Sequence, residues 1–428
     1  MIRRLVFLLL AASAAGAETN VTLLHFSDYH SHALPFYTEE GERGGIARAV
    51  AYLKREKRRG ALVFSGGDTV NKGAPAWSDK YGCAEWPWWN GVVDAMAFGN
   101  HDADYGRTAF DQCRKAVRYP ILSANTPGFE RYEVFVVNGI RIGVFAVAGS
   151  DFPSLVQAEG LTFTDPLAAA REVVQQLREK ERVQAVVMIG HQHLEADYDL
   201  ARAVPGIDLI FGSHSHVKRA LTRIDGTRTW FISPWQYLGY VSRVQLTFAG
   251  GRLTKAIGDL VPIDAHMPEE PAIARRVQTM QAALERDPVY RELFVPIGTL
   301  AAPLSVETLA QRTLEIMRTV AGADVVLSTK SSFRRALPAG TLTMELLRAA
   351  LPYDNEIVVC AMTGGQLQRV LGAAAAESFV SGADSIDPAR TYRVATTDYV
   401  AFVAYEEVFT CEKQKTGSRV RDELRKTF

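Results

Sequence analysis

The sequence predicts an α/β fold made of two domains joined by a connecting helix. Five short apolar runs, each long enough for one buried strand, are followed by clusters of polar residues with glycine beside most of them. Continuous apolar runs bounded by turn residues are typical of sheets covered on both faces. The 428 residues also exceed what one hydrophobic core usually sustains, so a second domain is expected in the C-terminal part.

Carboxylate, amide and imidazole groups follow these predicted strands. The apolar runs span residues 21–26, 61–64, 95–98, 185–189 and 207–211. The clusters after them are Asp28-Tyr29-His30, Gly67-Asp68, Gly99-Asn100-His101-Asp102, Gly190-His191 and Gly212-Ser213-His214-Ser215-His216. Because the carboxyl ends of strands form the functional edge of such sheets, we expect these groups to converge. Their chemistry suits a site for two borderline divalent metal ions.

The order and spacing of these motifs resemble the calcineurin-like metallophosphoesterase superfamily, and within it the secreted 5′-nucleotidase and UDP-sugar hydrolase family. The resemblance extends over nearly the whole mature chain. It rests on the segments 24–30, 44–48, 64–69, 97–106 and 205–216. It implies an N-terminal β-sandwich flanked by helices (αββα), a linker helix and a smaller C-terminal α/β substrate domain.

The resemblance also implies a dinuclear metal centre with seven protein ligands. Its members are Asp28, His30 and His216 for one ion, Asn100, His191 and His214 for the other, and Asp68 as the bridge. A shared carboxylate is needed because two cations about 4 Å apart repel each other strongly. A water bridging the ions would lose a proton at neutral pH and become the nucleophile. Zinc, manganese, iron and cobalt all suit these ligands.

One histidine of these clusters is expected to act on the substrate rather than on the metals. His101 would sit beside the leaving oxygen as proton donor or electrostatic stabiliser, oriented by Asp104. Asp102 is interpreted as a solvated or hydrogen-bonded carboxylate. The remaining histidines are interpreted as structural, solvent-exposed or neighbours of ligands, and they are His25, His32, His193 and His266.

The C-terminal region resembles the family's substrate domain less closely. Arg334 matches the arginine that binds phosphate or carboxylate through its planar fork, and Tyr353 matches a ring that stacks on a nucleobase. Asn355 belongs to the same motif. The glycine-rich loop that carries the second stacking ring is replaced by residues 403–407, where Tyr405 offers a ring in another position. We therefore predict broad base specificity, with interior packing as an equally good interpretation of Tyr353 and Tyr405.

The start of the chain predicts a cleavable signal peptide over residues 1–17. Arg3 and Arg4 precede a short apolar run, and small residues end it at Ala17. The protein is therefore expected to be periplasmic or secreted, without stable insertion into the membrane. Four cysteines suit an oxidising compartment. Their pairing cannot be deduced from the sequence, although Cys83 with Cys113 and Cys360 with Cys411 are natural candidates.

We expect a metallophosphoesterase domain over residues 18–264, a linker helix within 265–298 and a C-terminal domain over 299–428. The formal net charge is zero, so binding to nucleic acid through its phosphates is not expected, and we expect a monomer.

The leading hypothesis is a two-metal hydrolase of nucleotides and related phosphate esters. A thiosulfohydrolase of sulfur oxidation on the same scaffold, or a binding protein that retains the fold without catalysis, are the alternatives. No predicted ligand is missing, which favours an enzyme.

Overall fold

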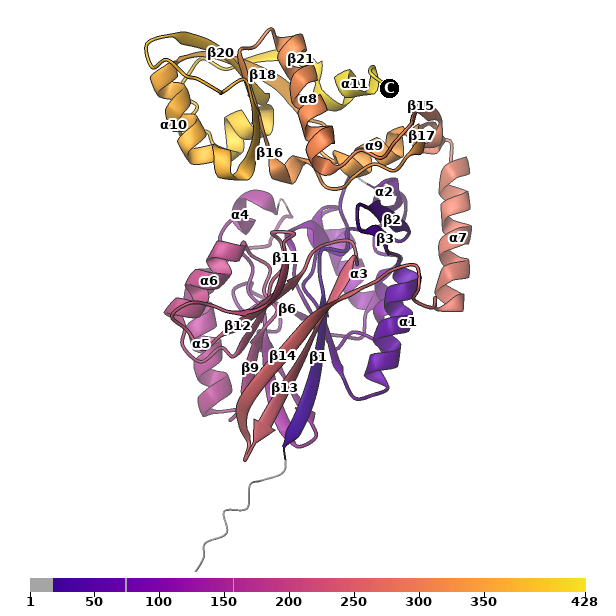
Figure 1. Cartoon of the computed structure of the whole chain (residues 1–428). Coiled ribbons are helices and arrows are strands. Elements are labelled where there is room, and N and C mark those ends of the chain that lie inside the picture. Colours follow the sequence, from indigo (N-terminus) through magenta and orange to yellow (C-terminus); the bar gives the residue numbers. More distant parts are fainter. Residues whose placement is uncertain (1–17, 74, 157) are drawn as a thin grey trace, which may run out of the picture.

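Two stacked six-stranded sheets form the N-terminal part of the chain (Figure 1). The computed structural model describes residues 18–73, 75–156 and 158–428, so the predicted signal peptide lies outside the described residues. The first sheet runs β14 (Arg252–Pro262), β13 (Tyr240–Ala249), β1 (Thr19–Phe26), β4 (Leu62–Ser65), β5 (Ala95–Ala97) and β6 (Ile121–Leu122). The second runs β11 (Lys218–Arg223), β12 (Trp230–Pro234), β10 (Leu209–Phe211), β9 (Ala185–Met188), β8 (Ile140–Phe145) and β7 (Tyr132–Val137).

Alternate side chains on the central strands point to opposite faces of the sheet, and both faces are buried. On β1, Leu23 packs into the core between the two sheets, whereas Leu24 packs outward against Val50 and Leu53 of helix α1 (Ile46–Lys57). The second sheet is covered on its outer face by α5 (Pro166–Glu179) and α6 (Leu194–Ala203). The predicted αββα sandwich is therefore confirmed.

Local chemistry explains where the covering helices begin. Asp165 caps α5 because its carboxylate accepts a hydrogen bond from the Leu167 amide at 2.9 Å, and Pro166 occupies the first helical turn. The shorter helices of this part of the chain are α2 (Ala76–Tyr81), α3 (Arg107–Ala116) and α4 (Phe152–Leu155). A small hairpin, β2 (Pro35–Thr38) with β3 (Gly41–Gly44), lies beside α2.

Helix α7 (Pro271–Arg286) links this sandwich to the C-terminal part (Figure 1), within the region where the linker helix is predicted. The C-terminal part contains a five-stranded sheet, β19 (Ser378–Ser381), β16 (Val325–Thr329), β20 (Thr391–Thr397), β18 (Glu356–Thr363) and β21 (Gln414–Arg419), and a two-stranded sheet, β15 (Pro296–Leu300) with β17 (Gly340–Thr343). Its α-helices are α8 (Val306–Ala321), α9 (Met344–Ala350), α10 (Gly364–Ala374) and α11 (Val420–Arg425). A two-domain α/β architecture follows, as predicted.

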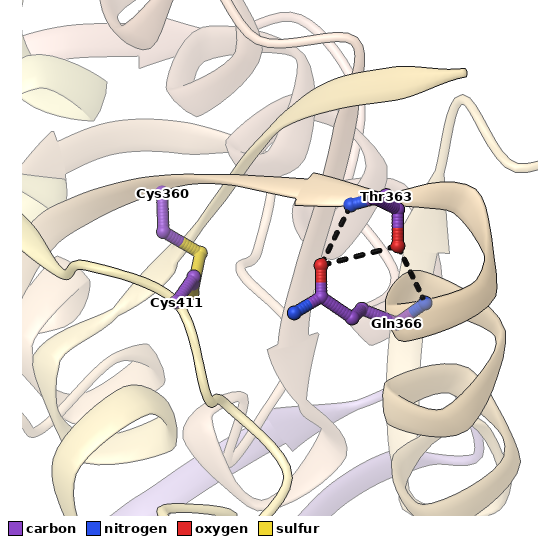
Figure 2. The surroundings of a disulfide bond; sticks show 4 residues. All are labelled: Cys360, Thr363, Gln366 and Cys411. Atoms are coloured by element: carbon purple, nitrogen blue, oxygen red, sulfur yellow. Dashed lines mark hydrogen bonds between the residues drawn. A yellow bond between two sulfur atoms is a disulfide. The ribbon is translucent and has the colours of Figure 1, made fainter. Parts of the chain in front are cut away.

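Two disulfides join the four cysteines. Cys83 pairs with Cys113, and Cys360 of β18 pairs with Cys411 in the loop before β21. Figure 2 shows the second bond near the start of α10, where Thr363 accepts from the Gln366 amide and Gln366 accepts from the Thr363 amide. This reciprocal pair satisfies amides that the helix itself cannot bond. Among the described residues, no helix has the length and apolar character needed to cross a membrane.

Candidate dinuclear metal centre

The polar clusters of five loops meet at one edge of the sandwich. Parallel pairing aligns β1 with β4 and β4 with β5, so the ends of these strands lie together. Strands β9 and β10 pair in the same way in the second sheet. The seven predicted ligands follow these five strands and are Asp28, His30, Asp68, Asn100, His191, His214 and His216. Six of them fall into two groups whose ligand atoms lie within 4.8 Å of one another.

The first group contains Asp28, His30 and His216. Nε2 of His216 lies 3.1 Å from Oδ1 of Asp28 and 3.1 Å from Nε2 of His30. Nδ1 of His30 donates to the carbonyl of Val70 at 3.2 Å, which leaves Nε2 as the lone-pair nitrogen. The two Nε2 atoms and a carboxylate oxygen therefore converge on one point, an arrangement that suits a cation.

The second group contains Asp68, His191 and His214. Nδ1 of His191 donates to the carbonyl of Gly66 at 2.6 Å, which leaves Nε2 facing Oδ2 of Asp68 at 3.2 Å. Oδ2 of Asp68 also lies 3.7 Å from Nε2 of His30. Asp68 thus stands between the two groups, where a shared ligand would be needed.

Asn100 provides an independent test of whether these residues fit a metal. Its Oδ1 is buried and has no hydrogen-bond partner among the described residues, although buried polar atoms are normally paired. An amide oxygen that has no hydrogen-bond partner, in a loop next to those that carry the carboxylates and imidazoles, is suited to bind a metal ion. The donor set therefore fits divalent ions that accept both nitrogen and oxygen ligands.

Burial and mutual attraction set the charge states of the ligands. Burial opposes ionisation of Asp68, but the nearby His191 and His101 hold the pKa of its carboxyl well below the usual range. Burial also lowers the pKa of His30, so that ring stays neutral. Ionised carboxylate and neutral imidazole are the forms that bind metals.

The backbone at these loops is unusual. Asp28, His30, Asp68, His214 and His216 all adopt positive φ angles between 49° and 62°. Asp and His tolerate this left-handed region better than most residues. Neighbouring positions are equally constrained, because a Cβ at residue 99 would lie 2.3 Å from the Asp68 amide nitrogen.

His101 lies beside the second group with its ring held by Asp104. Its Nδ1 donates to Oδ2 of Asp104 at 2.7 Å, and its backbone amide donates to Oδ1 of Asp68 at 2.8 Å. Burial disfavours the charged ring, but Asp68 and Asp104 outweigh it and raise the pKa of His101 to about 10. The protonated ring therefore has Nε2–H available as a donor.

Asp102, interpreted as a hydrogen-bonded carboxylate, is buried and accepts from three backbone amides. These are the amides of Asp68, Thr69 and Gly99, at 3.2, 2.7 and 2.8 Å. It therefore ties the Asp68 loop to the loop that carries His101.

Asp151 is a residue of this site that the sequence interpretation missed. Its Oδ2 lies 3.0 Å from Nε2 of His214 and 3.3 Å from Nε2 of His193. Because Nε2 of His214 faces this carboxylate, Nδ1 is the atom left for a metal. The signal was present in the sequence, since Asp151 follows the apolar run of β8 and stands near Gly149, as the other ligands stand near glycines.

The C-terminal part contributes Arg334 and Tyr353 to the edge of the site. The guanidinium of Arg334 contacts the His216 ring and donates to the Tyr353 hydroxyl at 2.9 Å. The carbonyl of Arg334 accepts from Gln236 of the sandwich at 2.9 Å. Asn355 precedes β18, and its carbonyl accepts from the Val420 amide at 2.9 Å.

The tyrosine suggested as a replacement ring lies elsewhere. Tyr405 packs against the core behind the five-stranded sheet. Tyr399, which the sequence interpretation did not single out, is 42% exposed, and its electrostatic neighbours include Tyr353, Arg334 and Asp151. Tyr399 is therefore a better candidate than Tyr405 for a second ring near the site.

Comparison with known proteins agrees with this geometry. Residues 21–218 match the calcineurin-like phosphoesterase family, and residues 299–382 match the 5′-nucleotidase C-terminal domain. Protein UshA of Yersinia enterocolitica is 25% identical, covering 89% of this chain and 85% of that protein. Among solved structures, a 5′-nucleotidase precursor of Thermus thermophilus has a TM-score of 0.74 at 21% identity, covering 95% and 96% of the two chains. A sulfate thiohydrolase SoxB from Thermus thermophilus has a TM-score of 0.73 at 21% identity, covering 95% and 94%.

The fold and the family matches together define a metal-dependent phosphoester hydrolase, a class that uses a dinuclear centre of divalent metals. More particularly, the chain combines a calcineurin-like phosphoesterase domain with a 5′-nucleotidase C-terminal domain.

Proposed function

We propose that this protein is a periplasmic or secreted hydrolase of nucleotides and related phosphate esters. The observation that carries the proposal is the convergence of carboxylate and imidazole donors beside the guanidinium of Arg334. Two divalent ions held there would neutralise phosphoryl charge and activate the attacking water. The signal-peptide pattern of residues 1–17 supports the location, and the expected boundaries 18–264, 265–298 and 299–428 remain part of the proposal.

The residues of the site have different roles in binding and hydrolysing the phosphate ester. Arg334 binds the phosphate through its fork of donors, next to His216. Protonated His101 donates from Nε2 to the leaving oxygen, and Asp104 fixes its ring. Two ions would be held by Asp28, His30, Asp68, His191, His214 and His216, together with the unpaired amide oxygen of Asn100.

Tyr353 and Tyr399 form the part of the site that meets the leaving group. Both rings are about two-fifths exposed, and Tyr353 is anchored through its hydroxyl to Arg334. Rings on the surface can stack on any base, since every base has an aromatic face. We therefore expect broad base specificity and appreciable hydrolysis of esters that lack a base.

A phosphate-release screen tests the proposal. It compares the four common nucleoside monophosphates, a sugar nucleotide, a cyclic nucleotide and a simple aryl phosphate, each with zinc, manganese, iron and cobalt. Nucleoside monophosphates should be cleaved with similar efficiency. An absence of phosphate release with every metal would contradict catalysis and favour a binding protein.

A sulfur substrate is a second candidate, because the TM-score against the 5′-nucleotidase precursor, 0.74, is nearly equal to that against the sulfate thiohydrolase SoxB, 0.73. The same screen therefore includes a carrier-linked thiosulfonate. Sulfate release exceeding phosphate release from every ester would favour the thiosulfohydrolase.

A further inference from the structure

A separate cavity of about 240 Å³ lies at the junction of the two domains. Its walls come from the loop after β1, from α2, from α7 and from α9, which lie close together in Figure 1. The junction is held by the Ala76 amide of the sandwich, which donates to Oε1 of Glu345 on α9 at 2.7 Å. The described residues that line this cavity include none of the seven metal ligands.

Four polar atoms on the lining residues are buried and have no hydrogen-bond partner in the described part of the chain. They are Nε1 of Trp77, Nε2 of His32, Nε of Arg335 and Oε2 of Glu345. His32 is 7% exposed, and its Nδ1 donates to the carbonyl of His30 at 3.0 Å, so Nε2 is an acceptor. The lining residues therefore carry two donors, on Arg335 and Trp77, and two acceptors that have no hydrogen bonds. Such groups are costly to bury without a partner.

The rest of the lining is largely apolar. Leu284 of α7 is fully buried, and Phe294, Leu346 and Ala349 complete this wall. The volume is below the roughly 300–1,000 Å³ of pockets that bury drug-sized ligands, so the occupant is small. A phosphate group fits poorly, because its remaining oxygens would face the acceptors on His32 and Glu345.

We propose that this junction cavity binds a small amphipathic acid: a carboxylate with a hydrogen-bond donor on the adjacent carbon and an apolar side chain. The carboxylate would pair with Arg335, and the donor would meet Oε2 of Glu345 or Nε2 of His32. The apolar side chain would lie against Leu284 and Phe294. Both α-amino acids and α-hydroxy acids have this pattern.

The cavity and the metal centre share neighbouring residues. Arg334 contacts His216, whereas Arg335 lines the cavity; His30 belongs to the metal centre, whereas His32 lines the cavity. The two sites are therefore joined through short pieces of backbone on both sides of the domain junction.

Calorimetric titration of the metal-loaded full-length protein tests the proposal with four probes of one size. L-leucine and 2-hydroxy-4-methylpentanoate should bind. 4-Methylpentanoate lacks the donor and should bind about fivefold more weakly, because one hydrogen bond contributes roughly 1 kcal/mol. 3-Methylbutylamine lacks the carboxylate and should not bind. If no probe binds, or if the amine binds as well as leucine, the proposal is overturned.

Variants locate the binding and separate the two ligand classes. Arg335→Gln should abolish binding of both acids, whereas Arg369→Gln, at an exposed arginine of α10, should not change it. Glu345→Gln should weaken the binding of leucine more than the binding of the hydroxy acid. Only the amino acid offers a cation to the Glu345 carboxylate. Ala349→Leu fills the cavity from the other side and should also abolish binding, which covers the case in which Arg335→Gln fails to fold.

One further control addresses the metals, which could themselves attract carboxylates. Asp68→Asn should keep the affinity of the wild type for leucine. Binding that is lost in Asp68→Asn but survives Arg335→Gln and Ala349→Leu would place the acid at the metals and overturn the assignment.

Discussion

Nε2 of His214 lies 3.0 Å from Oδ2 of Asp151, which orients the ring so that its Nδ1 is the atom left for a metal. A carboxylate behind a ligating histidine fixes the tautomer and raises the basicity of the ring. Asp151 is therefore a positioning residue for the proposed centre.

Asp151→Asn should weaken metal binding by about 10- to 100-fold while the fold is retained, because the orienting charge is lost. Competition with a chelator measures the affinity. Asp199→Asn, at an exposed aspartate of α6, is the matched control and should behave as wild type. Equal metal affinities in the two variants would show that Asp151 does not position a metal ligand.

Asp68→Asn should abolish turnover and lower the metal content, since Asp68 is the anion that lies between both groups. Asn tolerates the left-handed backbone at this position, so the circular dichroism spectrum should be unchanged. Full metal content with wild-type turnover would show that the ligand assignment is wrong.

His101→Ala should lower turnover by roughly 100-fold or more with unchanged metal content, in line with typical acid–base contributions. The loss should be smaller for an aryl phosphate whose leaving group needs no proton. Metal analysis is the decisive control, because depletion of metal in this variant would make His101 a ligand instead.

Tyr399→Ala should raise the Michaelis constants for nucleotides and leave that for a base-free ester nearly unchanged. One stacked base contributes about 1–3 kcal/mol, which corresponds to roughly ten- to hundred-fold. Tyr405→Ala is the control, since Tyr405 packs against the core and should affect stability rather than specificity. If Tyr405→Ala raised the Michaelis constants for nucleotides and Tyr399→Ala did not, Tyr405 would be the stacking ring.

The buried Glu85 should make stability depend on pH. Burial raises the pKa of its carboxyl to about 8, and its nearest polar contact is the Tyr29 hydroxyl. Between the unfolded value near 4.5 and 8, the folded state holds the proton more tightly, so the free energy of unfolding falls as pH rises. The slope is up to about 1.4 kcal/mol per pH unit.

Glu85→Gln should remove this slope, so the variant should gain stability relative to wild type between about pH 5.5 and about pH 7.5, inside the window in which the folded carboxyl keeps its proton. Urea midpoints of both proteins at the two pH values check this, and taking their difference cancels the other titrating groups. A constant difference across this range would exclude Glu85 as the source.

The sandwich and the convergence of the ligands could be predicted because every ligand closely follows one of five apolar strands in the sequence. Asp151 also follows an apolar strand, but its contact with His214 could not be predicted, because it depends on the bridge between Ala148 and His191, which is a contact between distant segments. Tyr399 and Tyr405 could not be distinguished either, since they stand at opposite ends of the wide helical turn over Val400–Ala404, which no local pattern in the sequence predicts. The junction cavity depends on how the two domains pack, and no local pattern encodes it.

The positive φ angles of Asp28, His30, Asp68, His214 and His216 limit how this centre could change during evolution. At such positions only glycine, asparagine, aspartate and histidine are readily accommodated. Glutamate and cysteine, which would alter the metal preference most, would have to distort the loops. New metal selectivity in this lineage should therefore arise by exchange among Asp, Asn and His.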